Sequence, residues 1–365
     1  MNSKTRIDSL DILRGLMALS VATYHLSIKS QLCASGSIFD SIQAITGNYG
    51  VQGFFIISGF CFFHLYSKTD WNDSELKSFH IKRFFRIAPL YYLAVFANLA
   101  LNLHVGPRTF SWQYFIENMT LTFGFFHPNH AMVLGGWSIG IEYVFYIALP
   151  ILIILTRKPI GLLLLTVLSI ALIIPWTFGA VENAAYAEKF HVYVQIPNHA
   201  FLFMLGAVLA RLRAAKSFRF TTKSFLVILV LLAALAFPYT DKFYSHFQTM
   251  TGFYRVKFLV IYFLIIALFS FYEVPQNILK RVLVFFGEIS YSVYLLHPFA
   301  FAAMVKIMPA QKGTILLFAL AMIATIVLSA IVYRYLELPG IKLGRKLSTL
   351  TASQGESSVC RRKQA

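Results

Sequence analysis

The chain has 365 residues, of which 58% are hydrophobic in type and only 13% are charged, about half the charged share of soluble domains. This composition excludes an ordinary soluble protein and favours a polytopic membrane protein. The formal net charge of +17 does not require a nucleic-acid partner, because cytoplasmic loops of membrane proteins are rich in Lys and Arg.

Apolar runs of about 20 residues, the length that crosses a bilayer, recur along the whole chain. They predict an all-α, polytopic membrane protein with about ten transmembrane helices. The predicted helices cover roughly 9–28, 50–67, 84–103, 137–155, 160–177, 197–212, 223–238, 256–272, 284–304 and 313–335. We expect a ten-span domain over 1–347, a disordered cytoplasmic tail over 348–365, and a short interfacial or re-entrant helix within 104–136.

The distribution of Lys and Arg predicts the orientation of these spans. With a cytoplasmic N-terminus, the inner segments hold 22 Lys and Arg and the outer segments hold 8. This ratio is what the positive-inside rule predicts, and it favours a cytoplasmic location for both the N-terminus and the C-terminus. It also accounts for the basic pI without nucleic acid.

The first predicted span contains a permanent cation, Arg14, and a titratable imidazole, His25. Eleven residues of helix place both on one face, about 16 Å apart along the axis. Ala18, Val21 and Ala22 form a stripe of small residues between them. Polar groups at membrane depth are usually functional, but a snorkelling arginine and a hydrogen-bonded structural histidine remain open.

Arginines also enter the third predicted span from the cytoplasmic side. In "HIKRFFRIAPLYY" (80–92), Arg83 and Arg86 are three residues apart and so share a helix face. Together with Arg14 they place three guanidinium groups at the inner level, which suits phosphate binding. The alternative is an ordinary positive-inside flank.

The fourth predicted span carries a carboxylate. In "GGWSIGIEYVFY" (135–146), Glu142 lies five residues beyond Trp137, roughly 7–8 Å into the membrane from outside. This is close to the depth expected for His25, so the two are a candidate acid–base pair. Pairing of Glu142 with a structural cation is the alternative.

The remaining histidines and the cysteines predict no further chemistry. His297 precedes a proline at mid-depth and is interpreted as structural rather than catalytic. Six further histidines receive the same interpretation: His64, His80, His104, His127, His130 and His191. The three cysteines form no CxxC pair, so neither a disulfide framework nor a metal site is expected.

Taken together in order, several motifs resemble the acyltransferase 3 family of membrane acyltransferases. They are "LDILRG" with the Arg14-x10-His25 spacing, "GFFIISGF" (53–60), "RFFR" before "IAPLYY", "WSIGIEYVFY", "ISYSVYLLHPF" (289–299) and "YRYLELPGIKLGRK" (333–346). The resemblance covers residues 6 to 346, nearly the whole chain.

The resemblance implies a multi-pass protein of the bacterial inner membrane that transfers an acyl group, usually acetyl. The donor is cytoplasmic acyl-coenzyme A, a substrate rather than a bound cofactor. The acceptor is a hydroxyl of a sugar in an envelope or secreted polysaccharide. Because only a short tail follows the last predicted span, a stand-alone form is expected.

The family's functional positions fall on residues already selected. Its essential pair, inner arginines and fourth-span acid correspond to Arg14 and His25, Arg83 and Arg86, and Glu142. Many members have a second acid after that glutamate, whereas this chain has Tyr143. We therefore assign His25, Glu142 and Arg14 to catalysis, and Arg14, Arg83 and Arg86 to donor binding.

The expected mechanism joins both lines of reasoning. The donor phosphates bind the inner arginines, the pantetheine arm follows the small-residue stripe, and His25 acts as general base with Glu142 orienting it. The rival hypothesis is a proton-coupled transporter, because buried Arg, His and Glu also form proton relays. The acceptor sugar and the oligomeric state stay open.

Overall fold

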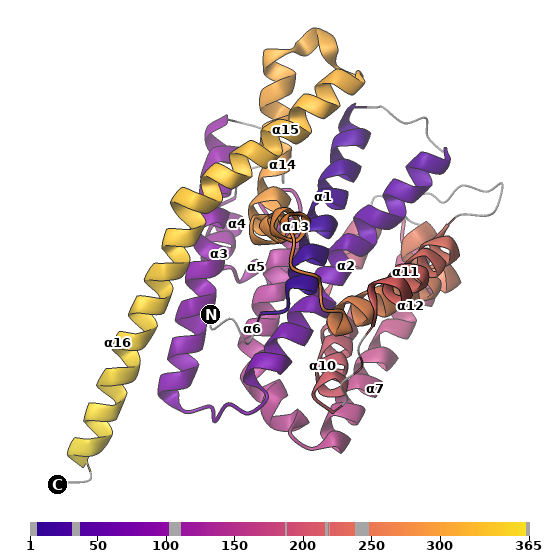
Figure 1. Cartoon of the computed structure of the whole chain (residues 1–365). Coiled ribbons are helices and arrows are strands. Elements are labelled where there is room, and N and C mark those ends of the chain that lie inside the picture. Colours follow the sequence, from indigo (N-terminus) through magenta and orange to yellow (C-terminus); the bar gives the residue numbers. More distant parts are fainter. Residues whose placement is uncertain are drawn as a thin grey trace.

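The computed structural model describes residues 6–30, 37–101, 111–186, 188–215, 218, 220–237 and 248–362, with side chains up to 350. Within these ranges every regular element is helical, which confirms the predicted all-α class. The larger helices are α1 (Asp8–Ser30), α2 (Ile38–Tyr66), α3 (Asp73–Leu101), α4 (Trp112–Thr120), α6 (Gly136–Thr156), α7 (Pro159–Pro175), α10 (Ala200–Ala215), α11 (Thr222–Ala236), α12 (Gly252–Phe271), α13 (Ile278–Glu288), α14 (Ser290–Ile307), α15 (Ile315–Val332) and α16 (Leu338–Arg362) (Figure 1).

Short helices connect these longer ones. They are α5 (Phe123–Phe126), η2 (Pro128–His130), η3 (Trp176–Ala180), α8 (Val181–Asn183), α9 (Lys189–Tyr193), η4 (Ile196–Asn198), η5 (Gln248–Met250), η6 (Pro309–Gln311) and η7 (Tyr333–Glu337). The short helix predicted within 104–136 is present as α4 and α5, whereas the start of that loop lies outside the described residues.

Among the described residues, six helices are long and apolar enough to cross a membrane, and seven if α13 and α14, bent by 66°, count as one span. This confirms a polytopic membrane protein. The predicted count of ten stays a prediction, because the first, sixth and seventh predicted spans fall on less suitable helices. Helix α1 carries four charged residues, and α10 and α11 have only 16 and 15 residues.

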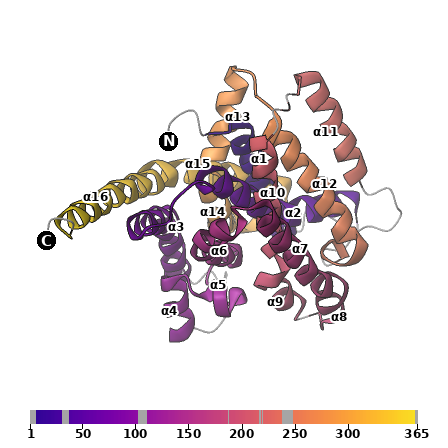
Figure 2. The ribbon, with the colours of Figure 1, turned by 90° about the horizontal axis from the view of Figure 1, so that it is seen from below.

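The outer helices expose apolar side chains as a lipid-facing surface does. On α7, Leu163, Leu164 and Leu168 are all more than half exposed. Continuous apolar surface of this kind is rare on soluble proteins, and hydrocarbon is the solvent that it fits. Figure 2 shows α11 and α12 side by side at one edge of the bundle and α16 reaching away at the other.

Helix α1 lies in the interior, packed against α2, α13 and α14. Glycines allow the closest helix crossings. A Cβ on Gly15 would lie 2.7 Å from the backbone of Gly287 on α13, and one on Gly59 would lie 2.1 Å from the carbonyl oxygen of Phe203 on α10. Small residues let helix backbones approach each other within a membrane, and here they fix the position of α1 and α2.

The small-residue stripe of α1 is a packing surface. Ala18, Val21 and Ala22 are fully buried, and the two alanines pack with Ile289 and Val293 at the start of α14. Since α14 covers the stripe, the expected passage for a pantetheine arm along it is wrong.

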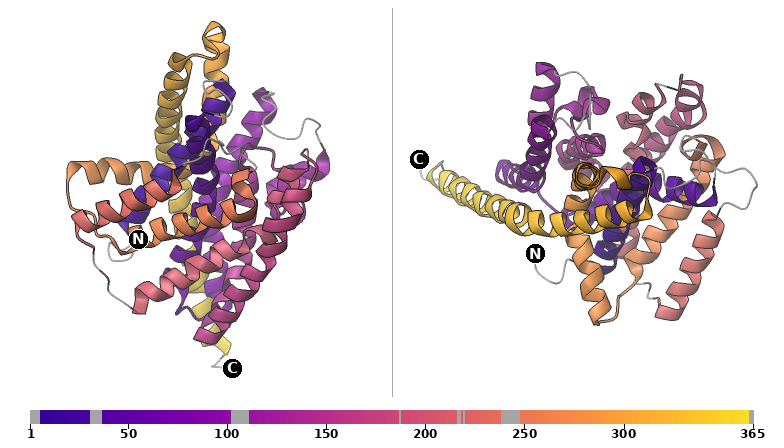
Figure 3. Two further views of the ribbon diagram at one scale, coloured as in Figure 1. Left: turned by 90° about the vertical axis from the view of Figure 1, so that its right-hand side faces the viewer. Right: turned by 90° about the horizontal axis from the view of Figure 1, so that it is seen from above.

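The C-terminal helix forms a long arm beside α3. Helices α15 and α16 are joined by one π-helical turn, η7, and α16 packs along α3 (Figure 3). The helix runs to Arg362 and so enters the segment predicted to be a disordered tail. The boundary at 347 therefore coincides with no helix end, and that division of the chain stays a prediction.

Candidate active site

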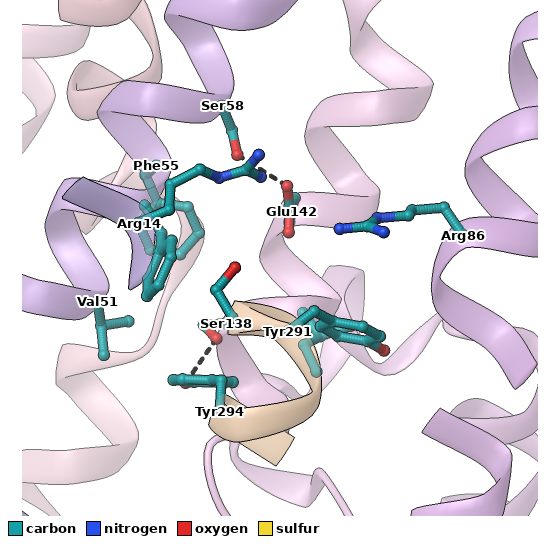
Figure 4. A pocket seen from close by; sticks show the side chains of 12 residues that line it. Arg14, Val51, Phe55, Ser58, Arg86, Ser138, Glu142, Tyr291 and Tyr294 are labelled. Atoms are coloured by element: carbon teal, nitrogen blue, oxygen red, sulfur yellow. Dashed lines mark hydrogen bonds between the residues drawn. The ribbon is translucent and has the colours of Figure 1, made fainter. Parts of the chain in front are cut away.

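The interior helices line a cavity that is partly open to its surroundings. It is lined by Arg14 of α1, Val51, Phe54, Phe55 and Ser58 of α2, Arg86 of α3, Ser138, Ile139 and Glu142 of α6, and Ser290, Tyr291 and Tyr294 of α14. Apolar walls with a few convergent polar groups are typical of small-molecule sites. Figure 4 shows these side chains from close by.

Glu142 is the carboxylate of this cavity. Its Oε1 accepts hydrogen bonds from Ser58 Oγ at 2.8 Å and from Tyr146 OH at 2.7 Å. Figure 4 shows the guanidinium groups of Arg14 and Arg86 extending toward it from opposite sides. Within the described residues neither arginine makes an ion pair with Glu142, so the cavity holds two cations near one acid.

Arg14 reaches the cavity from the middle of α1. Its Nε is buried and has no hydrogen-bond partner among the described residues, and its guanidinium lies within the electrostatic reach of Glu142 and Asp11. A cation inside a transmembrane helix bundle usually lines a polar cavity or a path for a substrate or an ion.

Arg86 is held by a second, deeper acid. Its Nη1 donates to Glu337 Oε1 at 2.5 Å, and Glu337 is only 1% exposed. The other carboxylate oxygen of Glu337 accepts from Ser292 Oγ at 2.7 Å. The carboxylate thus joins α3 to η7 and α14, and it fixes the arginine on the cavity wall.

Arg83 lies apart from the cavity lining. Its guanidinium packs over the rings of Phe62 at 4.8 Å and Phe79 at 5.5 Å, and its Nη2 donates to Tyr66 OH at 3.2 Å. The ring of Tyr146 is the fourth aromatic neighbour, at 5.9 Å. Since Tyr146 also donates to Glu142, Arg83 is one side chain removed from the cavity.

His25 is paired with His297. The two rings are stacked with 5.1 Å between centroids and 4° between planes, and His25 Nδ1 lies 3.1 Å from His297 Nε2. His297 Nδ1 lies 3.3 Å from the carbonyl oxygen of Val293, which can only accept. If His297 donates there, its Nε2 accepts from His25 Nδ1–H, and His25 Nε2 becomes the acceptor nitrogen.

Tyr294 connects the histidine pair to the cavity. Its ring lies 6.5 Å from that of His297, and its hydroxyl contacts Ser138 Oγ at 2.9 Å and donates to Gly135 O at 3.0 Å. Gly135 has φ of 79°, a left-handed conformation that a glycine adopts without strain. This turn starts α6 and so sets the height of Ser138 and Glu142.

Comparisons with known proteins identify the family of the chain. The acyltransferase domain of the acyltransferase 3 family matches residues 7–334. The chain belongs to this family. It is 23% identical to peptidoglycan O-acetyltransferase OatA of Listeria monocytogenes, over 94% of this chain and 57% of that protein.

Two further relatives carry related names. "Putative O-acetyltransferase SACOL0978" of Staphylococcus aureus is 24% identical over 93% of this chain and 58% of its own length. "Putative acetyltransferase ORF330" of Acidianus two-tailed virus is 30% identical over 78% of this chain and 80% of its own length. The chain thus spans little more than half the length of the first two relatives, and no solved structure matches it.

The structure brings together some of the acyltransferase 3 motif residues selected from sequence. Arg14, Arg86 and Glu142 share the cavity, whereas His25 and Arg83 lie outside its described lining. Within the described residues, His25 Nδ1 contacts His297 Nε2, and no hydrogen bond or ion pair joins His25 to Glu142. The assignment of the site residues stays a prediction, and His104 lies outside the described residues.

Sequence reasoning missed two partners. Glu337 is buried beside Arg86, and its signal was an acid within a helical, largely apolar segment. His297 was interpreted as structural, and its Pro298 neighbour gave no indication that its ring meets His25 across the bundle. Both contacts join residues more than 200 positions apart, which spacing cannot reveal.

Proposed function

We propose that this protein is a membrane O-acyltransferase that transfers an acetyl group from acetyl-coenzyme A, its acyl-coenzyme A donor, to a hydroxyl of a sugar. The sugar belongs to an envelope or secreted polysaccharide. The observation that carries the proposal is the cavity in which Arg14 and Arg86 face Glu142, beside the His25–His297 pair. Membership of the acyltransferase 3 family and the O-acetyltransferase names of relatives support it.

The donor side uses the arginines. Coenzyme A carries several phosphate charges, and guanidinium groups bind phosphate through paired N–H donors. Arg86 donates a hydrogen bond from Nη1 to Glu337 and has further N–H donors that can bind a ligand. Arg14 also extends toward the acid of the cavity and has an unpartnered Nε among the described residues, and Arg83 supports the site through Tyr146.

The transfer step uses His25. Its Nε2 takes the proton of the acceptor hydroxyl while the hydroxyl oxygen attacks the thioester carbon. The carbon–sulfur bond then breaks, and the coenzyme A thiolate leaves and is protonated by His25. The transferred acyl group ends on the sugar oxygen as an ester.

His297 and Glu142 have separate parts in this proposal. His297 accepts from His25 Nδ1–H, orients the ring and spreads the charge that His25 gains. Glu142 keeps Oε1 bonded to Ser58 and Tyr146 and directs its charge to the cavity, where it holds Arg14 and the acceptor hydroxyl in place. The orienting role predicted for Glu142 thus passes to His297.

The membrane and the orientation belong to the same proposal. We place the protein in a bacterial inner membrane with both ends cytoplasmic, because Lys and Arg divide 22 to 8 in favour of the inner segments. The acyl donor then enters from the cytoplasm and the sugar from outside.

Purified protein variants test the assignment. His25→Ala should lose about 10²–10⁴-fold in acyl transfer, measured as thiol release from acetyl-coenzyme A with a polysaccharide acceptor, while still binding the donor. His297→Gln keeps an acceptor for His25 Nδ1–H and should retain much more activity than His297→Ala. His64→Gln, a histidine stacked on Phe60 away from the cavity, is the matched control.

Two outcomes would contradict the proposal. Near wild-type transfer by His25→Ala would return His25 to a structural role. Substrate movement in proteoliposomes without any thiol release, even with acceptors present, would favour the proton-coupled transporter.

A further inference from the structure

A second cluster of polar side chains lies outside the cavity, in the segment before α6. Glu117 of α4, His127 at the end of α5 and His130 of η2 each offer one ligand atom, and these atoms lie within 4.8 Å of one another. Two imidazoles and one carboxylate are a common ligand set for Zn²⁺, whose remaining position is taken by water or a further group.

Two of the three ligand atoms already have the spacing that a metal ion requires. Ligand atoms 2.0–2.1 Å from a tetrahedral Zn²⁺ lie about 3.3 Å from each other. His127 Nδ1 lies 3.1 Å from Glu117 Oε1 and 3.2 Å from Oε2. His130 must approach by at most about 1.5 Å to complete the set.

His130 can make this movement at low cost. Its Nδ1 is buried and has no hydrogen-bond partner among the described residues, so no bond is lost when the ring turns. Its ring is confined by Tyr114, at 3.9 Å between centroids, and by His127, at 4.7 Å. A buried nitrogen without a partner is costly unless a ligand satisfies it.

The backbone around the cluster is held in place independently. Asn118 Nδ2 donates to Tyr114 O and to His130 O, and its Oδ1 accepts from Met132 N and Tyr91 OH. A single buried asparagine thus fixes α4 against the turn that carries the histidines. Glu117 itself is 12% exposed in its side chain and accepts from Gln113 as well as contacting His127.

We propose that Glu117, His127 and His130 form a binding site for a divalent transition-metal ion of the Zn²⁺ type. The ion clamps α4 to η2 and thereby stiffens the segment that leads into α6. This role is independent of the proposed acyl transfer, since metal binding can be measured without any substrate.

The test uses the full chain, purified without a histidine tag and stripped with a chelator. Titration with Zn²⁺ against a chromophoric chelator should show one tight site, and Co²⁺ should give the visible spectrum of a tetrahedral complex. Zn²⁺ should also raise the midpoint of thermal unfolding, because the ion binds the folded state alone.

Single variants identify the ligands. Loss of an outer-sphere partner typically weakens metal affinity about 10–100-fold. We expect a larger rise in the Kd for Zn²⁺ from each of three variants: Glu117→Gln, His127→Gln and His130→Gln. Glu117→Gln keeps the side-chain shape, so it also reports whether the segment still folds. The control is His80→Gln, a histidine on α3 outside the cluster, which should leave Kd unchanged.

Two results would overturn the site. The first is that the unmodified chain binds Zn²⁺ or Co²⁺ no more tightly than a variant in which all three ligand residues are Gln. The second is tight binding that all three single variants retain, which would assign the metal to other groups. In either case His127 and Glu117 form a simple hydrogen bond that needs no ion.

Discussion

The buried ion pair between Arg86 and Glu337 is the contact whose loss should be most informative. Glu337 is 1% exposed and accepts Arg86 Nη1 at 2.5 Å, while its second oxygen accepts Ser292 Oγ at 2.7 Å. Glu337→Gln preserves the volume and one carbonyl-type acceptor. It removes the negative charge that compensates the guanidinium.

The expected cost follows from the exposure of the two partners. Removing one member of a fully buried pair costs about 3–5 kcal/mol, because the other charge remains without compensation. Arg86 is 27% exposed, lines the cavity and keeps the amide oxygen of the new glutamine as an acceptor. The loss should therefore be smaller, about 1.5–3 kcal/mol, the value of one hydrogen bond to a charged group.

Unfolding by sodium dodecyl sulfate in mixed micelles measures this free energy. Glu288→Gln is the matched control, because Glu288 bonds Arg6 at 2.8 Å but both partners are about one-third exposed, at 32% and 33%. Exposed pairs contribute about 0–1 kcal/mol. In a double-mutant cycle, Arg86→Met with Glu337→Gln should cost less than the sum of the single changes.

A second readout separates stability from binding. Glu337→Gln should also weaken the affinity for coenzyme A, because a neutral amide holds Arg86 less firmly on the cavity wall than the carboxylate does. Equal stability of Glu337→Gln and Glu288→Gln, or strict additivity in the cycle, would refute the reasoning from burial.

Three further predictions rest on other contacts. Arg255 is fully buried and donates two hydrogen bonds to the η4 turn, so Arg255→Met should lower the unfolding free energy by about 2–4 kcal/mol in the same titration. A Cβ on Gly206 would lie 2.1 Å from a carbonyl oxygen of α2, so Gly206→Ala should cost about 1–3 kcal/mol, whereas Gly179→Ala, with nothing within 4 Å, should not destabilise the protein. In a cysteine-free background, Tyr186→Cys should react with an impermeant reagent in intact cells and Asn72→Cys only after permeabilisation, and the reverse pattern would overturn the proposed orientation.

The all-α membrane fold could be predicted from the sequence because hydropathy is a local property. An apolar run of about 20 residues reports its own solvent, whatever it packs against. The number of spans cannot be read from hydropathy alone, because helix length and helix bending depend on contacts with other segments. Helices α10 and α11 are short, and the bend of 66° between α13 and α14 depends on neighbouring helices.

The cavity was partly predictable. Arg14 and Glu142 stand out because an ionisable residue in an apolar run has few structural explanations. Depth estimates of this kind give the level of a residue along the membrane normal but not its direction around the helix. They therefore placed His25 with Glu142, whereas in the structure His25 meets His297 and Glu142 lies with Arg14 and Arg86.

The face of a helix that meets a given neighbour depends on packing between distant segments. The small residues of α1 could line a passage or admit another helix, and the sequence favours neither. The structure places α14 on Ala18 and Ala22, with Ile289 and Val293 filling the space. Small side chains in a membrane helix are in general better evidence for a close helix contact than for a channel.

The charge balance around the cavity connects its structure to the proposed chemistry. Glu337 compensates Arg86, and Ser58 and Tyr146 satisfy one oxygen of Glu142. Arg14 makes no ion pair within the described part of the chain, and its Nε has no partner there. Glu142 and Asp11 lie within its electrostatic reach and compensate its charge without a direct ion pair, so its Nε–H remains available to a ligand. In the proposed function, a phosphate oxygen of the acyl donor accepts this N–H, and the donor can leave again because the arginine keeps its compensating acids when the site is empty.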